Sequence, residues 1–465
     1  MRCGRLIVAA FASALLLPAP AAASRSMWSV FEDHNALVRT TPAKRQQMLE
    51  ELRLYMGADT LRIEVKWNEV APAPTARTKP VFDASNPAAY PGFFPYDDLI
   101  TRGRALGFRI IVTITGDAPR WATAGGKGRS FSTANWKVNS LEYARYATAV
   151  TRRYSGSFAG LPAVRYFTIW NEPNHRNFLK PTSQAPQIYR RMVDRAVPAI
   201  RQNGVRVFVG ELAPVGRRPR AMGPTEFLRK WLCLDGRFKR TSRGSGCRKC
   251  KRIRADGFAH HPYGPTSRVP RKLDVINMLA IRRLGIYLDR ARKARRFHKK
   301  LPIYNTEFGL QSNPPDPTVS TTLARQAALV NEKEEYAYRY SRLKSHSQYL
   351  MYDDPARPGP LSVKWSGFQT GLRFASGRRK PSYNAYRFPI VVKKRSRGVY
   401  VWGRVRPGTG PRFVRLQRKG GSYGPRIGTN ALGYFGVKRR VSGRYRFKAY
   451  NVQGNVLGTS RTARP

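Results

Sequence analysis

VRYFTIWNEPN, residues 164–174, predicts a buried β-strand that ends in a turn carrying a glutamate. The run is rich in β-branched and aromatic residues, as expected for a strand buried on both faces. Pro173 lacks a backbone donor and restricts Glu172 before it to extended conformations, so the chain has to turn there. The stretch therefore delivers a carboxylate at the carboxyl end of a buried strand, where α/β proteins bind their ligands.

A second strand-like run, LPIYNTEFG at residues 301–309, ends in Glu307, and Gly309 permits the turn after it. Hydrolysis of a glycosidic bond needs one carboxyl group to protonate the leaving oxygen and a second one to attack the anomeric carbon or to activate water. A single glutamate at a strand end is more often a surface salt-bridge partner. Two of them, each closing a buried strand, favour a catalytic pair.

Alternating strands and helices fill the chain between these runs and around them. The predicted strands cover residues 28–31, 60–66, 108–115, 164–170, 205–209, 255–260, 301–307 and 348–352. The predicted helices cover residues 41–56, 96–106, 140–154, 184–202, 225–232, 274–297, 323–343 and 381–386. Eight such units predict a (β/α)8 TIM barrel over residues 24–390. A doubly wound open sheet is the alternative, but no glycine-rich phosphate loop follows any strand.

The pattern changes after about residue 391. Short alternating runs at 398–404, 412–417, 433–440 and 443–450 are separated by glycine-rich turns. They predict a small antiparallel β-sandwich, Ig-like, over residues 391–465. This accessory domain either binds glycans or only stabilises the barrel, and the sequence leaves both open.

The first 23 residues are typical of a signal peptide. Arg2 and Arg5 precede an apolar run at 6–17, and small residues at 21–23 form a cleavage region. The apolar run is shorter than the roughly 20 residues that span a bilayer, so we expect no transmembrane segment. The mature chain is predicted to begin near Ser24 and to be secreted.

Secretion permits disulfide bonds. Because Cys3 leaves with the signal, Cys233, Cys247 and Cys250 remain. The Cys247-x-x-Cys250 spacing invites a zinc interpretation, but no second cysteine pair or spaced histidine pair accompanies it. A disulfide from Cys233 to either Cys247 or Cys250 is favoured, and the third thiol has no assigned role.

The formal charge of +59, from 86 Lys and Arg against 27 Asp and Glu, is extreme. One interpretation is attraction to a polyanion, such as an acidic polysaccharide, an anionic cell wall or nucleic acid. The other is a general arginine bias spread over solvated surfaces. The basic residues are scattered along the chain, and no nucleic-acid-binding motif occurs, so no nucleic-acid partner is expected.

IWNEPN, at 169–174, resembles the strand-four signature of clan A retaining glycoside hydrolases, which include families 5 and 39. YNTEFG, at 304–309, is similar to the strand-seven nucleophile segment of that clan. The resemblance covers the barrel, about residues 28–386. It implies that Glu172 is the general acid/base, that Glu307 is the nucleophile and that Asn171 holds the 2-hydroxyl of the substrate.

The same resemblance assigns supporting roles. His261 and Tyr263 match strand-six positions that line the sugar site and contact the nucleophile, and Arg62 matches a strand-two arginine beneath it. Alternatives remain: Arg62 as an ordinary barrel salt-bridge partner, Tyr263 as a core aromatic, and His260 in place of His261. Two further aromatic candidates lie just past strands two and three, where they could either stack on sugars or pack: Trp67 and Trp121.

One position departs from the clan pattern. Members often carry a tryptophan at the end of strand eight, whereas residues 349–354 contain none, and Trp365, beyond a proline-rich loop, is a candidate to replace it. The sequence thus predicts an exported, monomeric, retaining O-glycoside hydrolase that cleaves β-glycosidic bonds in a poly- or oligosaccharide without metal or cofactor. The alternative is a non-catalytic or transglycosylating protein that binds cell wall or acidic glycan on the same barrel.

Overall fold

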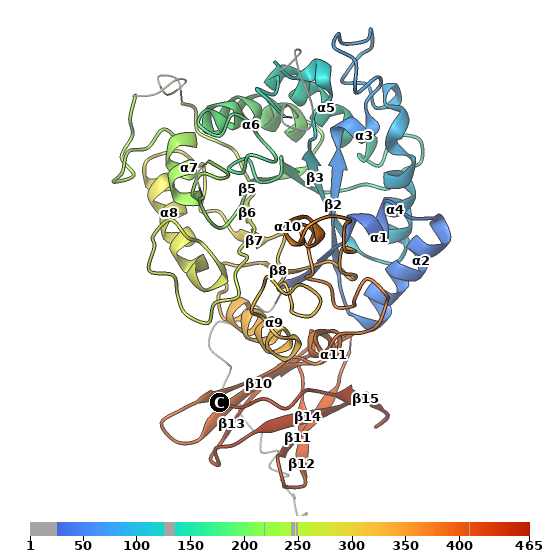
Figure 1. Cartoon of the computed structure of the whole chain (residues 1–465), viewed down its shortest axis with the longest axis vertical. Helices are drawn as coiled ribbons and strands as arrows, with labels where there is room; N and C mark the ends of the chain where they lie inside the picture. The colour runs from blue at the N-terminus through green and yellow to red at the C-terminus, as the bar shows by residue number, and fades with distance from the viewer. Residues whose placement is uncertain (1–25, 125–134, 218, 243–246, 248–249, 409) are drawn as a thin grey trace, which may run out of the picture.

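The computed structural model describes residues 26–124, 135–217, 219–242, 247, 250–408 and 410–465. Its centre is a ring of eight parallel strands in the order β7-β6-β5-β4-β3-β2-β1-β8 (Figure 1). Backbone hydrogen bonds join Ile303 of β7 to Arg342 and Lys344 before β8, and so close the ring. The strands are β1 Trp28–Glu32, β2 Thr60–Lys66, β3 Arg109–Thr115, β4 Tyr166–Ile169, β5 Arg206–Leu212, β6 Gly257–His260, β7 Ile303–Asn305 and β8 Ser345–Tyr349. The predicted TIM barrel is confirmed.

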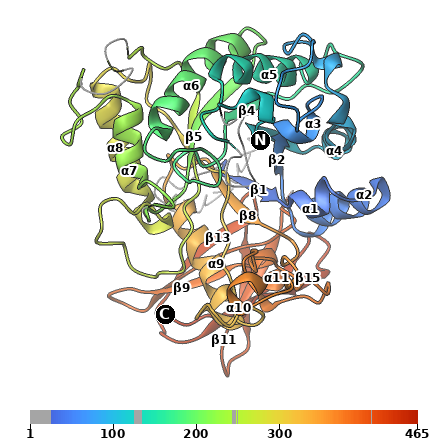
Figure 2. The same ribbon diagram turned by 45° about the horizontal axis from the view of Figure 1, so that its top comes forward.

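Helices surround the strands, as both views show (Figures 1 and 2). They are α1 His34–Leu37, α2 Pro42–Glu50, α3 Trp67–Val70, α4 Phe94–Ala105, α5 Ser140–Arg153, α6 Ala185–Arg201, α7 Pro224–Trp231, α8 Ile281–Lys293, α9 Leu323–Tyr338, α10 Leu361–Lys364 and α11 Pro381–Arg387. No helix among the described residues has the length and apolar character needed to cross a membrane.

A layer of side chains fills the barrel at its base. Val30, Ile111, Phe208 and Tyr304 come from β1, β3, β5 and β7, which are alternate strands of the ring. Phe208 and Tyr304 stack with ring centroids 4.0 Å apart. Alternate strands fill a TIM barrel in such layers. The base is therefore packed, and the polar chemistry of the interior lies above it, toward the carboxyl ends of the strands.

Several predicted elements have the wrong bounds, and for two of them the structure shows the reason. The eighth strand begins at Ser345, not at residue 348, because buried polar side chains with hydrogen-bond partners make up its start. The Ser345 hydroxyl donates to the Asn305 carbonyl at 2.8 Å, for example. The predicted helix 274–297 shortens to α8 because the Asp274 carboxylate instead accepts from the Thr225 backbone at the start of α7.

The C-terminal part forms the predicted β-sandwich. One sheet contains β9 Ile390–Lys394, β10 Val399–Arg404 and β13 Tyr434–Arg439, and the other contains β11 Phe413–Arg418, β12 Tyr423–Gly428, β14 Tyr445–Tyr450 and β15 Val456–Thr459. Their inner faces share a core around Val401, Leu416 and Phe447. Sequence analysis missed β9, β12 and β15. Neither of the last two contains a buried residue, and both lack a clean apolar alternation.

The sandwich packs against the barrel next to α9 and α11 (Figure 1), and a buried ion cluster joins the two parts. Arg406 donates to both oxygens of Glu334 on α9, at 2.6 and 2.9 Å, and Arg404 donates to Glu334 at 3.1 Å. Arg404 also reaches the Ser29 hydroxyl on β1 at 2.7 Å. Burial opposes ionisation, but the two guanidinium groups outweigh it and lower the pKa of Glu334 to about 2. The sandwich is thus bound to the barrel wall through buried charged contacts.

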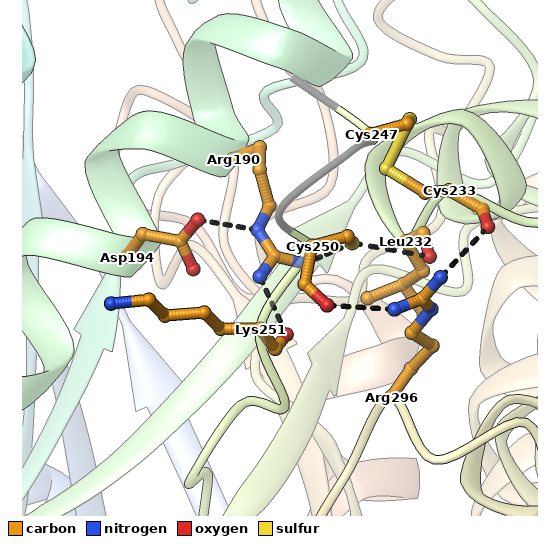
Figure 3. The surroundings of a disulfide bond; sticks show 8 residues. All are labelled: Arg190, Asp194, Leu232, Cys233, Cys247, Cys250, Lys251 and Arg296. Atoms are coloured by element: carbon orange, nitrogen blue, oxygen red, sulfur yellow. Dashed lines mark hydrogen bonds and ion pairs between the residues drawn. A yellow bond between two sulfur atoms is a disulfide. The ribbon is translucent and has the colours of Figure 1, made fainter. Parts of the chain in front are cut away.

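Cys233 and Cys247 form a disulfide, one of the two pairings left open by the sequence (Figure 3). Cys250 remains a thiol: Arg190 donates to its sulfur at 2.8 Å, and the thiol faces the Leu232 carbonyl at 3.5 Å. The predicted signal peptide lies outside the described residues.

Candidate active site

Glu172 and Glu307 face each other at the carboxyl end of the barrel. Glu172 follows β4, Glu307 follows β7, and His261 follows β6 directly. One carboxylate oxygen of each glutamate and one nitrogen of His261 all lie within 4.8 Å of one another. Residues from three separate strands therefore converge on one point, as the facing strand ends of a barrel predict.

The turn after β4 holds Glu172 in a strained conformation. Its φ is 36°, in the left-handed region, so the extended backbone predicted from Pro173 is wrong. Two hydrogen bonds fix the turn: the Glu172 amide donates to the Glu211 carbonyl at 3.0 Å, and the His175 amide donates to the Glu172 carbonyl at 2.8 Å. Such a conformation costs about 1–3 kcal/mol and persists where surrounding contacts enforce it, often at functional sites.

Glu307 is held from two sides. The Tyr263 hydroxyl donates to one carboxylate oxygen at 2.6 Å, and the Arg62 guanidinium donates to the other at 2.9 Å. Only 11% of the Glu307 side chain is exposed. Both partners were assigned this position by the clan resemblance, and the structure places both of them against Glu307. The carboxylate therefore has a fixed orientation toward the barrel mouth.

Arg62 is the centre of the buried network. Beyond Glu307, it donates to Glu32 at 2.5 Å, to Glu211 at 2.5 Å and to the side-chain oxygen of Asn171 at 2.7 Å. Its Nε donates to the Thr113 hydroxyl at 3.1 Å. All of its donors are thus directed at oxygens inside the barrel, which is the condition for burying a guanidinium. Asn171, whose oxygen faces Arg62, is oriented by the same contact.

His261, not His260, faces the glutamates. Its Nδ1 lies 3.0 Å from Glu172 and 3.5 Å from Glu307, and its Nε2 lies 3.7 Å from Glu211. Burial favours the neutral ring, but the three carboxylates outweigh it and raise the pKa of His261 to about 10. His260 points the other way, to the Ile276 carbonyl at 2.6 Å, and burial lowers its pKa to about 3. An imidazolium at His261 donates a hydrogen bond to Glu172 near neutral pH.

The carboxylates of the network differ in their environments. Burial raises the pKa of Glu307, against the opposing attraction of His261 and Arg62. Burial also raises the pKa of Glu32 well above its ordinary value. For Glu211, burial is outweighed by Arg62 and His261, which lower its pKa to about 2. Glu211 is therefore ionised near neutral pH and balances Arg62, whereas burial favours the protonated form of Glu32.

Sequence analysis missed Glu32 and Glu211. Glu32 is the last residue of β1, one position past the predicted strand. Glu211 lies in a bulge of β5, where the register between β5 and β6 shifts between Gly210 and Leu212. A bulge re-aims one side chain, and here it places the Glu211 carboxylate inside the barrel. The rule that found Glu172, a carboxylate at the end of a buried strand, would have found Glu32 had it been applied to every strand, but not Glu211, which lies past the predicted end of its strand.

The sugar-stacking role considered for Trp67 is wrong. Its indole is fully buried and stacks on Tyr146, with centroids 5.0 Å apart. Trp121 packs edge-on against Trp67 at 5.7 Å and against Phe82, and only 9% of it is exposed. Both belong to an aromatic cluster outside the strand ring, where burial outweighs any benefit from facing the barrel mouth.

Different aromatic residues stand at the end of β8. The Tyr349 ring packs edge-on against Tyr263 at 6.4 Å, and Phe368, which is 41% exposed, packs on Tyr349 at 5.3 Å. Trp365 follows α10 and is half-buried, with the Lys364 ammonium 5.9 Å from its ring. Tyr349 and Phe368 thus extend the aromatic contacts of Tyr263 at the end of β8, and the role of Trp365 stays a prediction.

Among the described residues, two groups of side chains have the spacing that a metal ion would need. They share Glu307, which groups with Glu172 and His261 on one side and with Glu32 and Glu64 on the other. A cation in either group would sit next to the Arg62 guanidinium, which already supplies positive charge to Glu32 and Glu307. Because Arg62 already balances the charge of Glu32 and Glu307, the second group has less need of a bound cation.

Several solved structures are similar to this chain over most of its length. A glucosidase from Croceicoccus marinus has a TM-score of 0.53 at 13% identity, covering 90% of this chain and 94% of that one. An endo-β-1,4-mannanase from Thermotoga petrophila has a TM-score of 0.44 at 13% identity, covering 95% and 98%. A GH5_18 protein from Bifidobacterium longum has a TM-score of 0.48 at 14% identity, covering 78% of both chains.

No protein-family model matches the sequence, and no curated protein sequence does so either. At 13% identity, the likeness to the glucosidase shows a shared fold. The predicted resemblance to clan A, whose members are built on this barrel, is thereby confirmed at the level of the fold.

Proposed function

We propose that this chain is a retaining O-glycoside hydrolase acting on β-glycosidic bonds. One observation carries the proposal: carboxylate oxygens of Glu172 and Glu307 approach within 4.8 Å across the barrel mouth. Retaining glycosidases hold their two carboxyl groups about 5–5.5 Å apart, whereas inverting ones leave about 6.5–9.5 Å for a water molecule. The short separation favours double displacement.

In the first step a carboxylate oxygen of Glu307 forms a bond to the anomeric carbon, and the bond to the leaving oxygen breaks. Glu172 gives its proton to that oxygen, so the leaving group departs as a neutral alcohol. In the second step Glu172, now a carboxylate, takes a proton from water as the water attacks the anomeric carbon. Glu307 leaves as a carboxylate, and the product keeps the starting anomeric configuration.

The surrounding side chains support these roles. Tyr263 and Arg62 orient Glu307, and their donated hydrogen bonds stabilise its charged form before and after the covalent intermediate. Arg62 holds the oxygen of Asn171, which leaves the amide nitrogen to donate to the sugar 2-hydroxyl. His261 donates a hydrogen bond to Glu172 and so orients its carboxyl group. Phe368 and Tyr349 offer aromatic faces beside the sugar.

The test is the stereochemistry of the first product. A panel of aryl β-glycosides of glucose, mannose, galactose and glucuronic acid is incubated with the protein, and proton NMR follows the anomeric signals. The β-anomer as the first product supports the proposal, and the sugar that is cleaved identifies the substrate class. First appearance of the α-anomer would contradict double displacement.

Export belongs to the proposal as well. The predicted signal segment, residues 1–23, has the composition of a secretory leader. The Cys233–Cys247 disulfide supports an oxidising destination, because such bonds are rare where thiols are kept reduced.

A further inference from the structure

The barrel has a cavity at the end opposite the glutamates. Its volume is about 660 Å³, within the range of small-ligand sites. Trp28, Arg109 and Tyr166 each begin a strand of the ring, and Asp59 directly precedes β2, so the cavity lies at the amino ends of β1 to β4. Leu432 of the sandwich domain forms part of the wall. Active sites of TIM barrels lie at the other end, so this cavity is separate from the glutamate pair.

The lining carries an excess of positive charge. Arg53, Arg104, Arg109 and Arg165 face one carboxylate, that of Asp59. Arg109 reaches Asp59 at 3.4 Å, whereas Arg53 and Arg104 donate to backbone carbonyls, and none of Arg53, Arg104 and Arg165 pairs with a carboxylate among the described residues. Guanidinium groups without a carboxylate partner around one cavity favour a ligand that brings its own oxyanions.

Aromatic rings stand beside these charges. Trp28 is half-buried and contacts Tyr166 and Tyr304, with ring centroids 4.9 and 5.1 Å apart. The Arg109 guanidinium lies 4.1 Å from the Trp28 ring centroid, which holds both groups in place. A cavity lined by an aromatic ring and guanidinium groups is expected to bind a ligand that has an apolar ring face and attached anionic groups.

We propose that this cavity binds an acidic saccharide, a sugar carrying carboxylate or sulfate groups, as a site separate from catalysis. The carboxyl end of the barrel is lined by Glu32, Glu64, Glu172, Glu211 and Glu307, which repel anions. Of the two ends of the barrel, the amino end is therefore the one whose lining attracts an acidic glycan. A polymer held there leaves the glutamate pair accessible, so the cavity anchors the protein to an anionic matrix.

The experiment compares two charge-reversal variants of the full protein. Arg104→Glu/Arg165→Glu changes two exposed cavity residues, and Arg191→Glu/Arg195→Glu changes two exposed residues of α6 and gives the same net charge. Circular dichroism and thermal unfolding establish that each is folded; Arg104→Gln/Arg165→Gln replaces the first if it is not. Calorimetry at physiological salt uses an oligogalacturonate, a heparin-derived oligosaccharide, a neutral mannan oligosaccharide and inorganic phosphate as probes.

We expect the wild-type protein to bind one of the two acidic oligosaccharides, and the probe that binds tells carboxylate from sulfate. The cavity variant should weaken that binding at least tenfold, a loss of about 1.4 kcal/mol, while the α6 variant stays close to wild type. Equal weakening by both variants would mean that total charge alone attracts the polymer. Binding of phosphate as tight as that of the oligosaccharide, binding of the neutral probe, or no binding would also overturn the proposal. None of these readouts needs turnover, so the proposed hydrolase activity can fail independently.

Discussion

The two ends of the barrel use arginine in opposite ways. At the carboxyl end Arg62 is fully buried, and Glu32, Glu211 and Glu307 surround it. At the amino end four arginines line an open cavity with one carboxylate, and 35% of the Arg109 side chain is exposed. A buried guanidinium surrounded by carboxylates orients them, whereas exposed guanidinium groups in excess remain available to an outside anion. The net charge of +59 therefore does not indicate what the arginines do until their positions in the structure are known.

The largest expected effect is a loss of turnover when the carboxyl end of the barrel is changed. Glu307→Gln keeps the size of the side chain but removes the attacking carboxylate, so hydrolysis of an activated aryl β-glycoside should fall by at least about 10³-fold. Steady-state kinetics measure it, with Glu50→Gln, an exposed residue of α2, as the control. Turnover within a few-fold of wild type would remove Glu307 from the mechanism.

Glu172→Ala tests the other half of the pair. Loss of the general acid should slow a substrate with a poor leaving group by about 10²–10⁴-fold and one with a good leaving group much less. Azide should restore the second step and release a β-glycosyl azide, detectable by NMR. If azide gives no rescue and both leaving groups are affected equally, Glu172 acts in another way.

Glu211→Gln should show how much the charge of Glu211 in the buried network contributes to the free energy of unfolding. The pKa of Glu211 in the folded protein, about 2, lies below its ordinary value of 4.5, so its charge stabilises the fold above pH 4.5. That contribution is about 3 kcal/mol near neutral pH and is lost as pH falls from 4.5 toward 2. Urea unfolding between pH 3 and 7 should show the gap between wild type and variant narrowing as the pH falls. A gap that stays constant would contradict the assignment.

Arg109→Gln should have the smallest effect. It removes a half-exposed ion pair with Asp59 and the contact with Trp28, worth together about 1 kcal/mol. Because the ion pair faces solvent, 1 M NaCl should shrink this loss of unfolding free energy, whereas salt should barely change the loss in Glu211→Gln. Equal salt dependence of the two variants would remove the contrast between the barrel ends.

The sequence predicted the parts of the site that interrupt a strong pattern. Glu172 and Glu307 stand out because each ends an apolar run before a turn. Glu211 escaped because its strand was predicted to end at residue 209, and a bulge at Gly210 is a feature of pairing rather than of local sequence. Trp67 was misjudged since a tryptophan after a strand looks the same whether it packs outside the ring or faces the mouth. Burial is decided by distant neighbours such as Tyr146, which no local pattern contains.

Strand bounds, too, were predicted well where buried residues are apolar and poorly where they are polar. Strands with buried apolar alternation were found nearly at their true bounds, as β2 was, but β8 was displaced because its first buried residues are polar. The cavity at the amino end had no counterpart in the sequence analysis. Its arginines come from three separate segments, and the pairing of neighbouring strands brings them together.

The most direct test of the central claim is to trap the covalent intermediate. The protein is incubated with 2-deoxy-2-fluoro β-glycosides carrying a good leaving group, and intact-protein and peptide mass spectrometry locate the adduct. We predict one fluoroglycosyl group per chain, bound to Glu307, with a sugar that matches the one cleaved in the NMR panel. An adduct on another residue, or rapid cleavage of the parent glycoside with no adduct from its fluorinated form, would contradict double displacement through Glu307.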